Sequence, residues 1–161
     1  MTSGADRPIG IFDSGVGGLT VVGELWRRLP AEPVVYFGDT ARVPYGPKSP
    51  DTVRRYAREA SAFLLSRSVK MVVVACNTAT AHAAGLLARE LPVPVIGVIE
   101  PGARAAVRAT RSGRIGVVGT AGTIASGAYD REVRRLMPDA RVFAQACPLF
   151  VPLVEEGLAD H

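Results

Sequence analysis

The run MVVVACNTAT at residues 71–80 decides the fold, because an apolar segment passes directly into a polar one. Met71–Ala75 is rich in β-branched residues and apolar on both faces, which is typical of a parallel strand covered by helices on each side. Cys76 follows this strand at once, and the polar residues after it indicate the start of a helix. We therefore predict a thiol at the carboxyl end of a buried parallel strand.

Similar apolar runs alternate with helix-like segments along the whole chain. We predict further strands at Pro8–Phe12, Val34–Phe37, Val95–Val98, Ile115–Val118 and Val142–Ala144. The clearest helix begins after Ser49, which suits an N-cap, and its apolar residues recur every three or four positions from Val53 to Leu64. This alternation predicts an α/β fold with a mainly parallel sheet and flanking helices.

The turn at Glu100-Pro101-Gly102 indicates a domain boundary near residues 98–102. We therefore predict a first α/β domain at residues 1–98 and an incomplete second α/β domain at residues 99–161. A final helix is expected at Phe150–Leu158, with no closing strand after it. A mature domain could also end in this way, so the ending alone leaves truncation open.

Composition excludes several classes of protein. With 48% hydrophobic and 21% charged residues over 161 positions, the chain is globular rather than disordered. The net charge of +4 comes from arginines interleaved with acids, which favours solvated helix faces over a nucleic-acid site. Cys76 and Cys147 form no CxxC pair, so we expect no metal site and no disulfide framework. Without an apolar segment of signal-peptide or membrane-spanning type, we expect a cytoplasmic protein that does not bind membranes.

Loops at the carboxyl ends of the strands are where an open α/β sheet forms its sites. The loop DSGVGG, residues 13–18, places Asp13 at a strand end, and its glycines let the backbone surround a small group. Its spacing matches neither the P-loop nor the Rossmann pattern, and a tight turn capped by the aspartate is the alternative. The loop GDTARVPYGP, residues 38–47, is long for its position and is often part of the site in such folds, and a Pro/Gly-rich surface loop is an equal alternative.

Cys76 begins the third loop and is the strongest catalytic candidate. A helix N-terminus facing the thiol is expected to lower its pKa and favour the thiolate. Asn77 and Thr78 add hydrogen-bonding groups around the same point. A small buried core residue is the alternative reading of a lone cysteine.

The fourth loop, GTAGT at residues 119–123, could bind a carboxylate through its hydroxyls and backbone N–H groups. A helix start capped by threonine is the alternative. His82 lies about a turn and a half beyond Cys76, so we predict a helix-surface residue and no Cys-His dyad. Cys147 lies in an apolar context and is predicted to be a packing residue.

Taken together, these loops resemble the glutamate racemases of the cofactor-independent aspartate/glutamate racemase family. DSGVGG, PYG and CNTAT in this order form a specific combination, and the likeness covers essentially the whole chain as the N-terminal part of such an enzyme. The matching stretches are IGIFDSGVGGLTV (residues 9–21), VVYFGDTARVPYGPKS (34–49), VVVACNTATA (72–81), GVIEPGA (97–103), VVGTAGTIASGAY (117–129) and ACPLFVPLVEEG (146–157).

The resemblance implies two α/β domains facing each other across a cleft, each supplying one cysteine for proton transfer at the α-carbon of glutamate. It implies interconversion of L- and D-glutamate without cofactor or metal, to supply D-glutamate for peptidoglycan, by an enzyme compatible with a homodimer. It assigns Cys76 as the thiol of the first domain and Asp13 as the carboxylate that assists it. The residues implied to hold glutamate are Ser14, Tyr45, Gly46, Asn77, Thr78, Thr120 and Thr123.

One feature of the family is missing from the chain. The second cysteine of the family lies in a Cys-Thr-His motif, which does not occur here, and Cys147 does not match it. We therefore expect a chain without the second acid/base thiol.

Two alternative functions remain open. One is a relative that acts on aspartate or a hydantoin. The other is a non-catalytic binding module of the type that inhibits DNA gyrase, and the evenly spread arginines lend no support to this second alternative.

Overall fold

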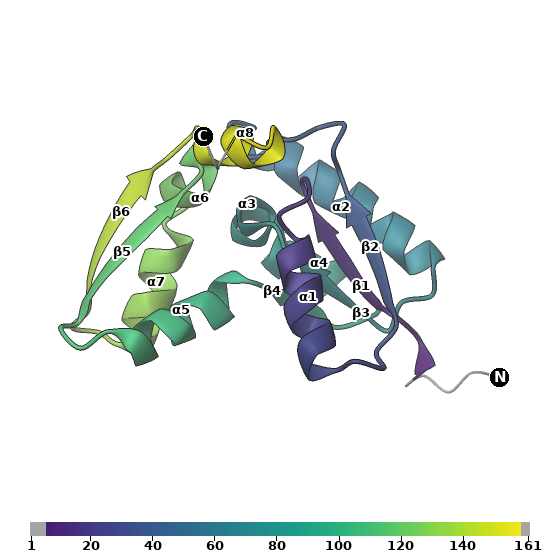
Figure 1. The fold of residues 1–161 in the computed structure, drawn as a ribbon, viewed down its shortest axis with the longest axis horizontal. Helices are drawn as coiled ribbons and strands as arrows, with labels where there is room; N and C mark the ends of the chain where they lie inside the picture. The colour runs from purple at the N-terminus through teal and green to yellow at the C-terminus, as the bar shows by residue number, and fades with distance from the viewer. Residues whose placement is uncertain (1–5, 159–161) are drawn as a thin grey trace.

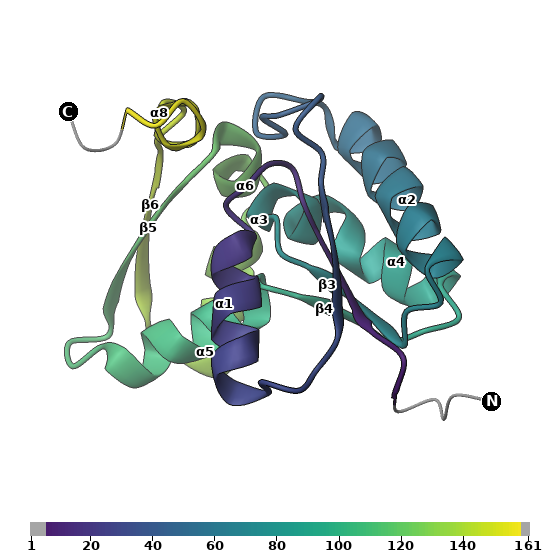
Figure 2. The same ribbon diagram turned by 45° about the vertical axis from the view of Figure 1, so that its right-hand side comes forward.

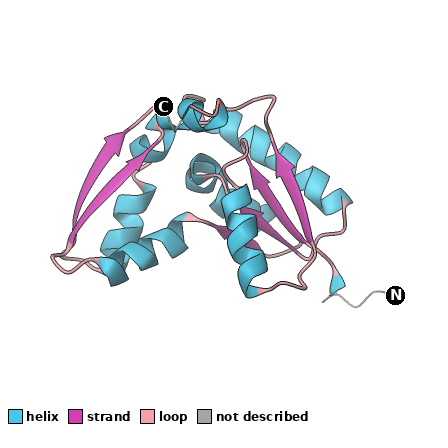
Figure 3. Cartoon of the chain, in the orientation of Figure 1, coloured by secondary structure: helices cyan, strands magenta, loops and turns pink. Residues whose placement is uncertain are grey.

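The structure is a computed structural model that describes residues 6–158. Its elements alternate between strands and helices along the chain (Figure 1; Figure 3). The strands are β1 (Ile9–Asp13), β2 (Val34–Gly38), β3 (Met71–Val74), β4 (Val95–Gly97), β5 (Arg114–Gly119) and β6 (Arg141–Ala146). The helices are α1 (Leu19–Arg28), α2 (Pro50–Ser66), α3 (Asn77–Ala79), the π-helix η2 (Thr80–Ala84), α4 (Gly85–Glu90), α5 (Ile99–Ala109), α6 (Ala121–Ala125), α7 (Ala128–Leu136) and α8 (Phe150–Glu155).

The strands form two separate parallel sheets, which confirms the predicted α/β class. One sheet has the order β2-β1-β3-β4 and the other pairs β5 with β6. We call the four-stranded sheet with α1, α2, α3, η2 and α4 the first lobe, and the two-stranded sheet with α5, α6 and α7 the second lobe. Figure 1 shows the lobes side by side, with α8 lying above the space between them.

The first lobe has helices on both faces of its sheet, as the apolar strands predict. Figure 2 shows α1 on one face and α2 with α4 on the other. β1 is buried along its whole length, and three of the four residues of β3 are buried. The predicted cap of α2 is present, because Ser49 Oγ accepts a hydrogen bond from the backbone N–H of Thr52 at 3.2 Å. Val53 and Leu64 on its predicted apolar stripe are completely buried.

The second sheet differs from the prediction of strands covered on both faces. α5 and α7 cover one face and build a core around Ile115 and Val133. On the other face, Val118 is 62% exposed and Phe143 is 53% exposed within the described part of the chain. An apolar strand thus identifies a parallel sheet, but it does not show that both faces are packed within residues 6–158.

The predicted element boundaries are nearly all within two residues of the observed ones. The final helix is shorter, because it ends at Glu155 instead of Leu158. The outer ends of the two predicted domains, residues 1–5 and 159–161, lie outside the described residues.

Among residues 6–158, none of the helices combines the length and the apolar character that crossing a membrane requires.

Parallel pairing brings the predicted loops together. Asp13 pairs with Gly38, and Phe12 pairs with both Phe37 and Val74. β1, β2 and β3 therefore end at the same edge of the sheet, and the loops that follow them face the second lobe there.

Candidate active site

A cleft of about 620 Å³ lies between the two lobes. The strand ends of the first sheet form one side, and β5, α6 and α7 form the other, with part of α8 also lining the space. The structure brings every predicted site residue to this cleft. Those residues are Asp13, Ser14, Tyr45, Gly46, Cys76, Asn77, Thr78, Thr120 and Thr123.

Cys76 lies at the base of the cleft as the N-cap of α3. Its Sγ accepts a hydrogen bond from the backbone N–H of Ala79 at 3.4 Å, so the predicted meeting of thiol and helix N-terminus is present. The thiol also donates to Ser14 Oγ at 3.5 Å. With 6% of its surface exposed, Cys76 is held in one orientation and is almost dehydrated.

The expected lowering of the thiol pKa by the helix N-terminus is present, but it is outweighed. Burial raises the pKa of Cys76, and the negative charge of Asp13 raises it further. The hydrogen bonds that Cys76 makes with Ser14 and Ala79 lower the pKa, but they do not outweigh these two effects. A three-residue α-helix followed by a π-helix contributes less than the loss of water around the sulfur. The resting group is thus a protonated thiol, and its thiolate is a stronger base than an exposed one.

Asp13 has a structural role in addition to its position beside Cys76. Its Oδ2 accepts hydrogen bonds from the backbone N–H groups of Gly15 at 3.2 Å and Gly18 at 3.0 Å. A Cβ at Gly18 would lie 2.7 Å from Cβ of Asp13, so the loop closes this tightly only with glycine there. The catalytic and the capping interpretations of Asp13 are therefore compatible with each other.

The loop after Asp13 does not present free donors to a ligand at every position. The backbone N–H of Val16 donates to Oε1 of Glu155, at 3.0 Å, and this bond attaches α8 to the loop. Tyr36 donates its hydroxyl hydrogen to the carbonyl of Gly15 at 2.8 Å. The glycine-rich loop is thus ordered by carboxylates and a phenol of the chain itself.

Tyr45 is completely buried, and its hydroxyl donates to Oδ2 of Asp39. Nε of Arg42 donates to the same carboxylate oxygen at 2.7 Å. Because the phenol is already hydrogen-bonded, Tyr45 offers the cleft its ring and its backbone rather than a free hydroxyl. The same carboxylate ties two residues of the loop at residues 38–47 together.

Three threonine hydroxyls meet across the cleft. Oγ1 of Thr78 lies 2.8 Å from that of Thr120 and 3.1 Å from that of Thr123, and the latter two are 3.0 Å apart. The backbone N–H of Thr123 is bonded to Oγ1 of Thr120, and that of Gly122 donates to the carbonyl of Gly46 at 2.9 Å. At these two positions the predicted backbone donors are already occupied, and the three hydroxyls bond to one another, so a carboxylate would have to take the place of one of these mutual bonds.

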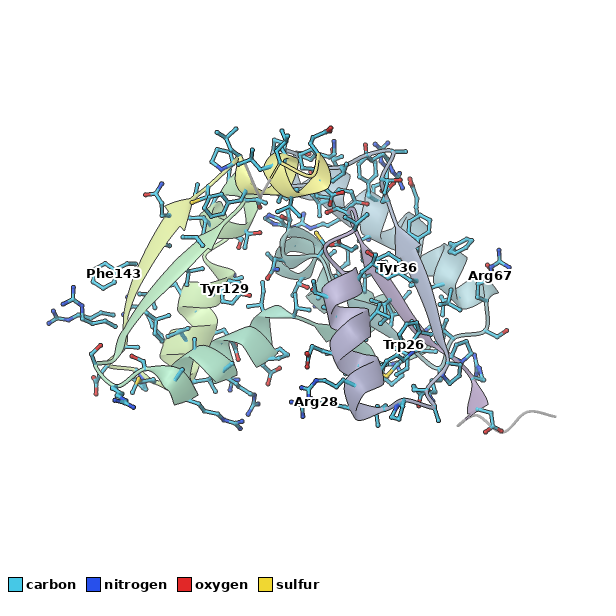
Figure 4. All side chains as sticks on the ribbon, viewed as in Figure 1. Trp26, Arg28, Tyr36, Arg67, Tyr129 and Phe143 are labelled. Carbon is cyan, nitrogen blue, oxygen red and sulfur yellow. The ribbon has the colours of Figure 1, made fainter. Side chains whose placement is uncertain are left out.

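Asn77 is held from the second lobe. Its Oδ1 accepts a hydrogen bond from the hydroxyl of Tyr129 at 2.8 Å. Figure 4 shows the labelled Tyr129 side chain extending from α7 toward the first lobe. This contact fixes the amide of Asn77 so that its NH₂ group remains available in the cleft.

Several residues in or near the cleft were not identified by sequence reasoning. Tyr129 and Glu155 come from α7 and α8, which meet the first lobe only in the folded chain. Cys147 lines the cleft although it was predicted to be a packing residue. His82 is half-buried rather than on the helix surface, and its ring contacts the second lobe instead of Cys76. A long-range contact gives no periodic signal, so no sequence pattern indicated these four residues.

Replacing Gly46 by alanine should push the two lobes apart. An added Cβ would lie 2.5 Å from Cβ of Thr120, and overpacking of this kind costs about 1–3 kcal/mol. Gly23→Ala in α1 is the matched control, because its Cβ would meet nothing within 4 Å and helical alanine gains about 0.5–1 kcal/mol over glycine. Urea unfolding should therefore shift in opposite directions for the two variants. Equal midpoints would show that the Gly46 contact is not close.

The stability of the chain should fall in alkaline solution. Burial raises the pKa values of Cys76, Tyr36 and Tyr45 above their ordinary values. The unfolded chain then loses these protons first, near pH values of about 8.5 for cysteine and about 10 for tyrosine. Stability from these groups is complete below that range and is lost as the pH rises through it. Urea midpoints at pH 7.5 and 10.5 measure the loss, which should be smaller in Tyr36→Phe; an equal loss would contradict this.

Comparisons with known proteins agree with this geometry. The family model described as Asp/Glu/Hydantoin racemase matches residues 18–158. A glutamate racemase from Geobacter metallireducens is 59% identical over 155 residues, which are 96% of this chain and 57% of that protein. The chain thus spans a little over half the length of this relative.

Solved structures show the same likeness. The crystal structure of a glutamate racemase isoform from Bacillus anthracis matches with a TM-score of 0.93 and 47% identity, over 97% of this chain and 59% of that one. The glutamate racemase from Francisella tularensis, solved in complex with D-glutamate, matches with a TM-score of 0.87 and 41% identity, over 95% of this chain and 57% of that one. The arrangement of both lobes is therefore shared with these proteins.

Proposed function

Since the chain belongs to the Asp/Glu/hydantoin racemase family, we propose that it acts in the interconversion of L- and D-glutamate, as a cytoplasmic isomerase that supplies D-glutamate for peptidoglycan. Cys76 carries the proposal. It is a buried thiol, fixed by two hydrogen bonds beside a carboxylate, at the base of a cleft between two lobes. We place the boundary between the two domains near residue 98, where the first sheet ends.

The chemistry begins with removal of the α-proton. The Cys76 thiolate takes this proton and becomes a thiol, while the electron pair of the broken C–H bond moves into the substrate carboxylate. An α-proton is a very weak acid, so the base must be strong and the site dry. The raised pKa of Cys76 meets the first condition, and its burial meets the second.

Asp13 receives the thiol proton when the thiolate forms and returns it in the reverse direction. The Coulombic influence of Asp13 on the pKa of Cys76 supports this pairing. The negative charge that develops on the substrate carboxylate needs donors held in advance. The hydroxyls of Thr78, Thr120 and Thr123 supply them, and Ser14 and Asn77 act beside the thiol.

The proposed chemistry uses no imine to an enzyme lysine. The two lysines of the chain, Lys48 and Lys70, are not among the residues that line it. The backbone of Tyr45 and Gly46 lines the cleft where the far end of the substrate would lie. Reprotonation from the opposite face needs a second acid, which the family resemblance places in a Cys-Thr-His motif that does not occur in residues 1–161.

The substrate is tested by comparing glutamate with aspartate and a hydantoin. Each compound is incubated with the 161-residue chain in deuterated buffer, and deuterium at the α-carbon is measured by mass spectrometry. We expect glutamate to exchange at least about tenfold faster than aspartate, because one extra methylene in a fitted pocket is worth about 1–3 kcal/mol. Faster exchange of aspartate or of the hydantoin would identify the relative that acts on that compound instead.

A further inference from the structure

The side chain of His82, on the π-helix η2, points toward the second lobe. A π-helix turns less per residue than an α-helix, so the side chains on it point in different directions from those of a regular helix. On this turn, Nε2 of His82 lies 3.2 Å from the carbonyl oxygen of Gly122. A carbonyl oxygen only accepts hydrogen bonds, so Nε2 must carry a proton in this contact.

The Gly122 residue is held from its other side as well. Its backbone N–H donates to the carbonyl of Gly46 at 2.9 Å. A Cβ at Gly122 would lie 2.7 Å from that same oxygen, so the two backbones are in direct contact. The first lobe thus forms hydrogen bonds with both the backbone N–H and the backbone C=O of Gly122 in α6.

The turn that carries His82 is itself tied down. Nε of Arg54 donates to the carbonyl of His82 at 3.1 Å, and Arg54 pairs with Asp51 at 2.8 Å. Oγ1 of Thr80 donates to the carbonyl of Val74 at 2.8 Å, two residues before the catalytic thiol. A continuous set of contacts therefore connects the end of β3 with the second lobe through His82.

We infer that His82 is a positioning residue that holds the Gly122 peptide. This contact keeps the hydroxyls of Thr120 and Thr123 within reach of Thr78 and so sets the width of the cleft. His82 does not line the cleft, so it acts through α6 and not on a ligand. The part of the inference that concerns substrate rests on the proposed function.

The protonation of the wild-type ring gives the first test. Long-range ¹H–¹⁵N NMR of the 161-residue chain should show neutral His82 as the Nε2–H tautomer, with slow exchange of that proton. His161, the other histidine of the chain, is removed by His161→Ala to assign the signals. An Nδ1–H tautomer, or an Nε2 proton that exchanges as fast as that of a free imidazole, would overturn the inference. This test needs no substitution at His82, so a loss of folding cannot confuse it.

Two substitutions give the second test. His82→Leu keeps the bulk and removes the donor, and His82→Gln places an amide N–H near the position of Nε2. Loss of one hydrogen bond should speed amide exchange of Gly122 about three- to tenfold in His82→Leu, with Ala75 unchanged as the core reference. His82→Gln should restore most of the protection. Unchanged exchange in His82→Leu, or no restoration by glutamine, would contradict the assigned role.

The substrate readout separates the inference from the proposed function. If glutamate exchanges its α-proton, His82→Leu should raise KM by a similar three- to tenfold while kcat changes less than twofold, and His82→Gln should reverse this. Gly122→Ala disturbs the same contact from the other side and should also raise KM. A fall in kcat alone would overturn the positioning role. If the wild-type chain does not act on glutamate, the proposed function is wrong. The NMR results then still test whether His82 holds the Gly122 peptide.

Discussion

Replacing Cys76 by alanine is expected to slow α-proton exchange of glutamate by at least about 10³-fold. A positioned acid/base group contributes about 10²–10⁴-fold, and Cys76 is the base in the proposed chemistry. The substitution removes one buried sulfur and leaves the backbone N–H of Ala79 unpaired, so the fold should remain with a modest loss of stability. Deuterium uptake at the α-carbon measures the rate, and circular dichroism checks the fold.

Cys147→Ala is the matched control for this substitution. Cys147 also lines the cleft, but it is only half-buried, and it comes from the segment after β6. Its replacement should change the exchange rate less than tenfold if Cys76 is the base. Equal losses in the two variants would show that the cleft needs both thiols or that neither has the assigned role.

Replacing Asp13 by asparagine should separate its charge from its capping role. Asparagine keeps one oxygen to accept from Gly15 and Gly18, but it loses the negative charge beside Cys76. The pKa of the thiol should fall, because the Asp13 charge raises it. The exchange rate should nevertheless drop by about 10²-fold, since the group that receives the thiol proton is gone.

Alkylation of Cys76 by iodoacetamide as a function of pH measures the thiol pKa, with Cys147→Ala as the background. A lower alkylation midpoint together with slower exchange supports the proton-transfer role of Asp13. A lower midpoint with faster exchange would mean that Asp13 only suppresses the thiolate. Asp13→Ala should add a loss of about 1 kcal/mol in the free energy of unfolding, because the hydrogen bonds to the backbone N–H groups of Gly15 and Gly18 are removed as well.

The first lobe was predictable because its signals are local. The β-branched runs, the Ser49 cap and the position of Cys76 after β3 all point to the same sheet, and parallel strands necessarily bring their carboxyl ends together. The residues that line the first-lobe side of the cleft follow from that rule. The loop at residues 119–123 was predictable in the same way, as the end of another strand.

The contacts between the lobes could not be predicted from these signals. The hydroxyl of Tyr129 reaches Asn77 over 52 positions of sequence, and Glu155 reaches Val16 over 139. The net direction of the Cys76 pKa shift could not be predicted from the helix N-terminus alone, because a sequence pattern shows the helix start but not how completely the thiol is buried. His82 was predicted as a surface residue because an α-helical turn was assumed where the chain forms a π-helix.

The most direct test of the account is the stereochemistry of α-deuterium uptake. L-glutamate and D-glutamate are incubated separately with the 161-residue chain in deuterated buffer and then separated by chiral chromatography with mass detection. Cys76 meets only one face of the α-carbon, so one enantiomer should gain a single deuterium at least about tenfold faster than the other and keep its configuration. Absence of uptake by both enantiomers, or equal uptake that persists in Cys76→Ala, would contradict the assignment of Cys76 as the base.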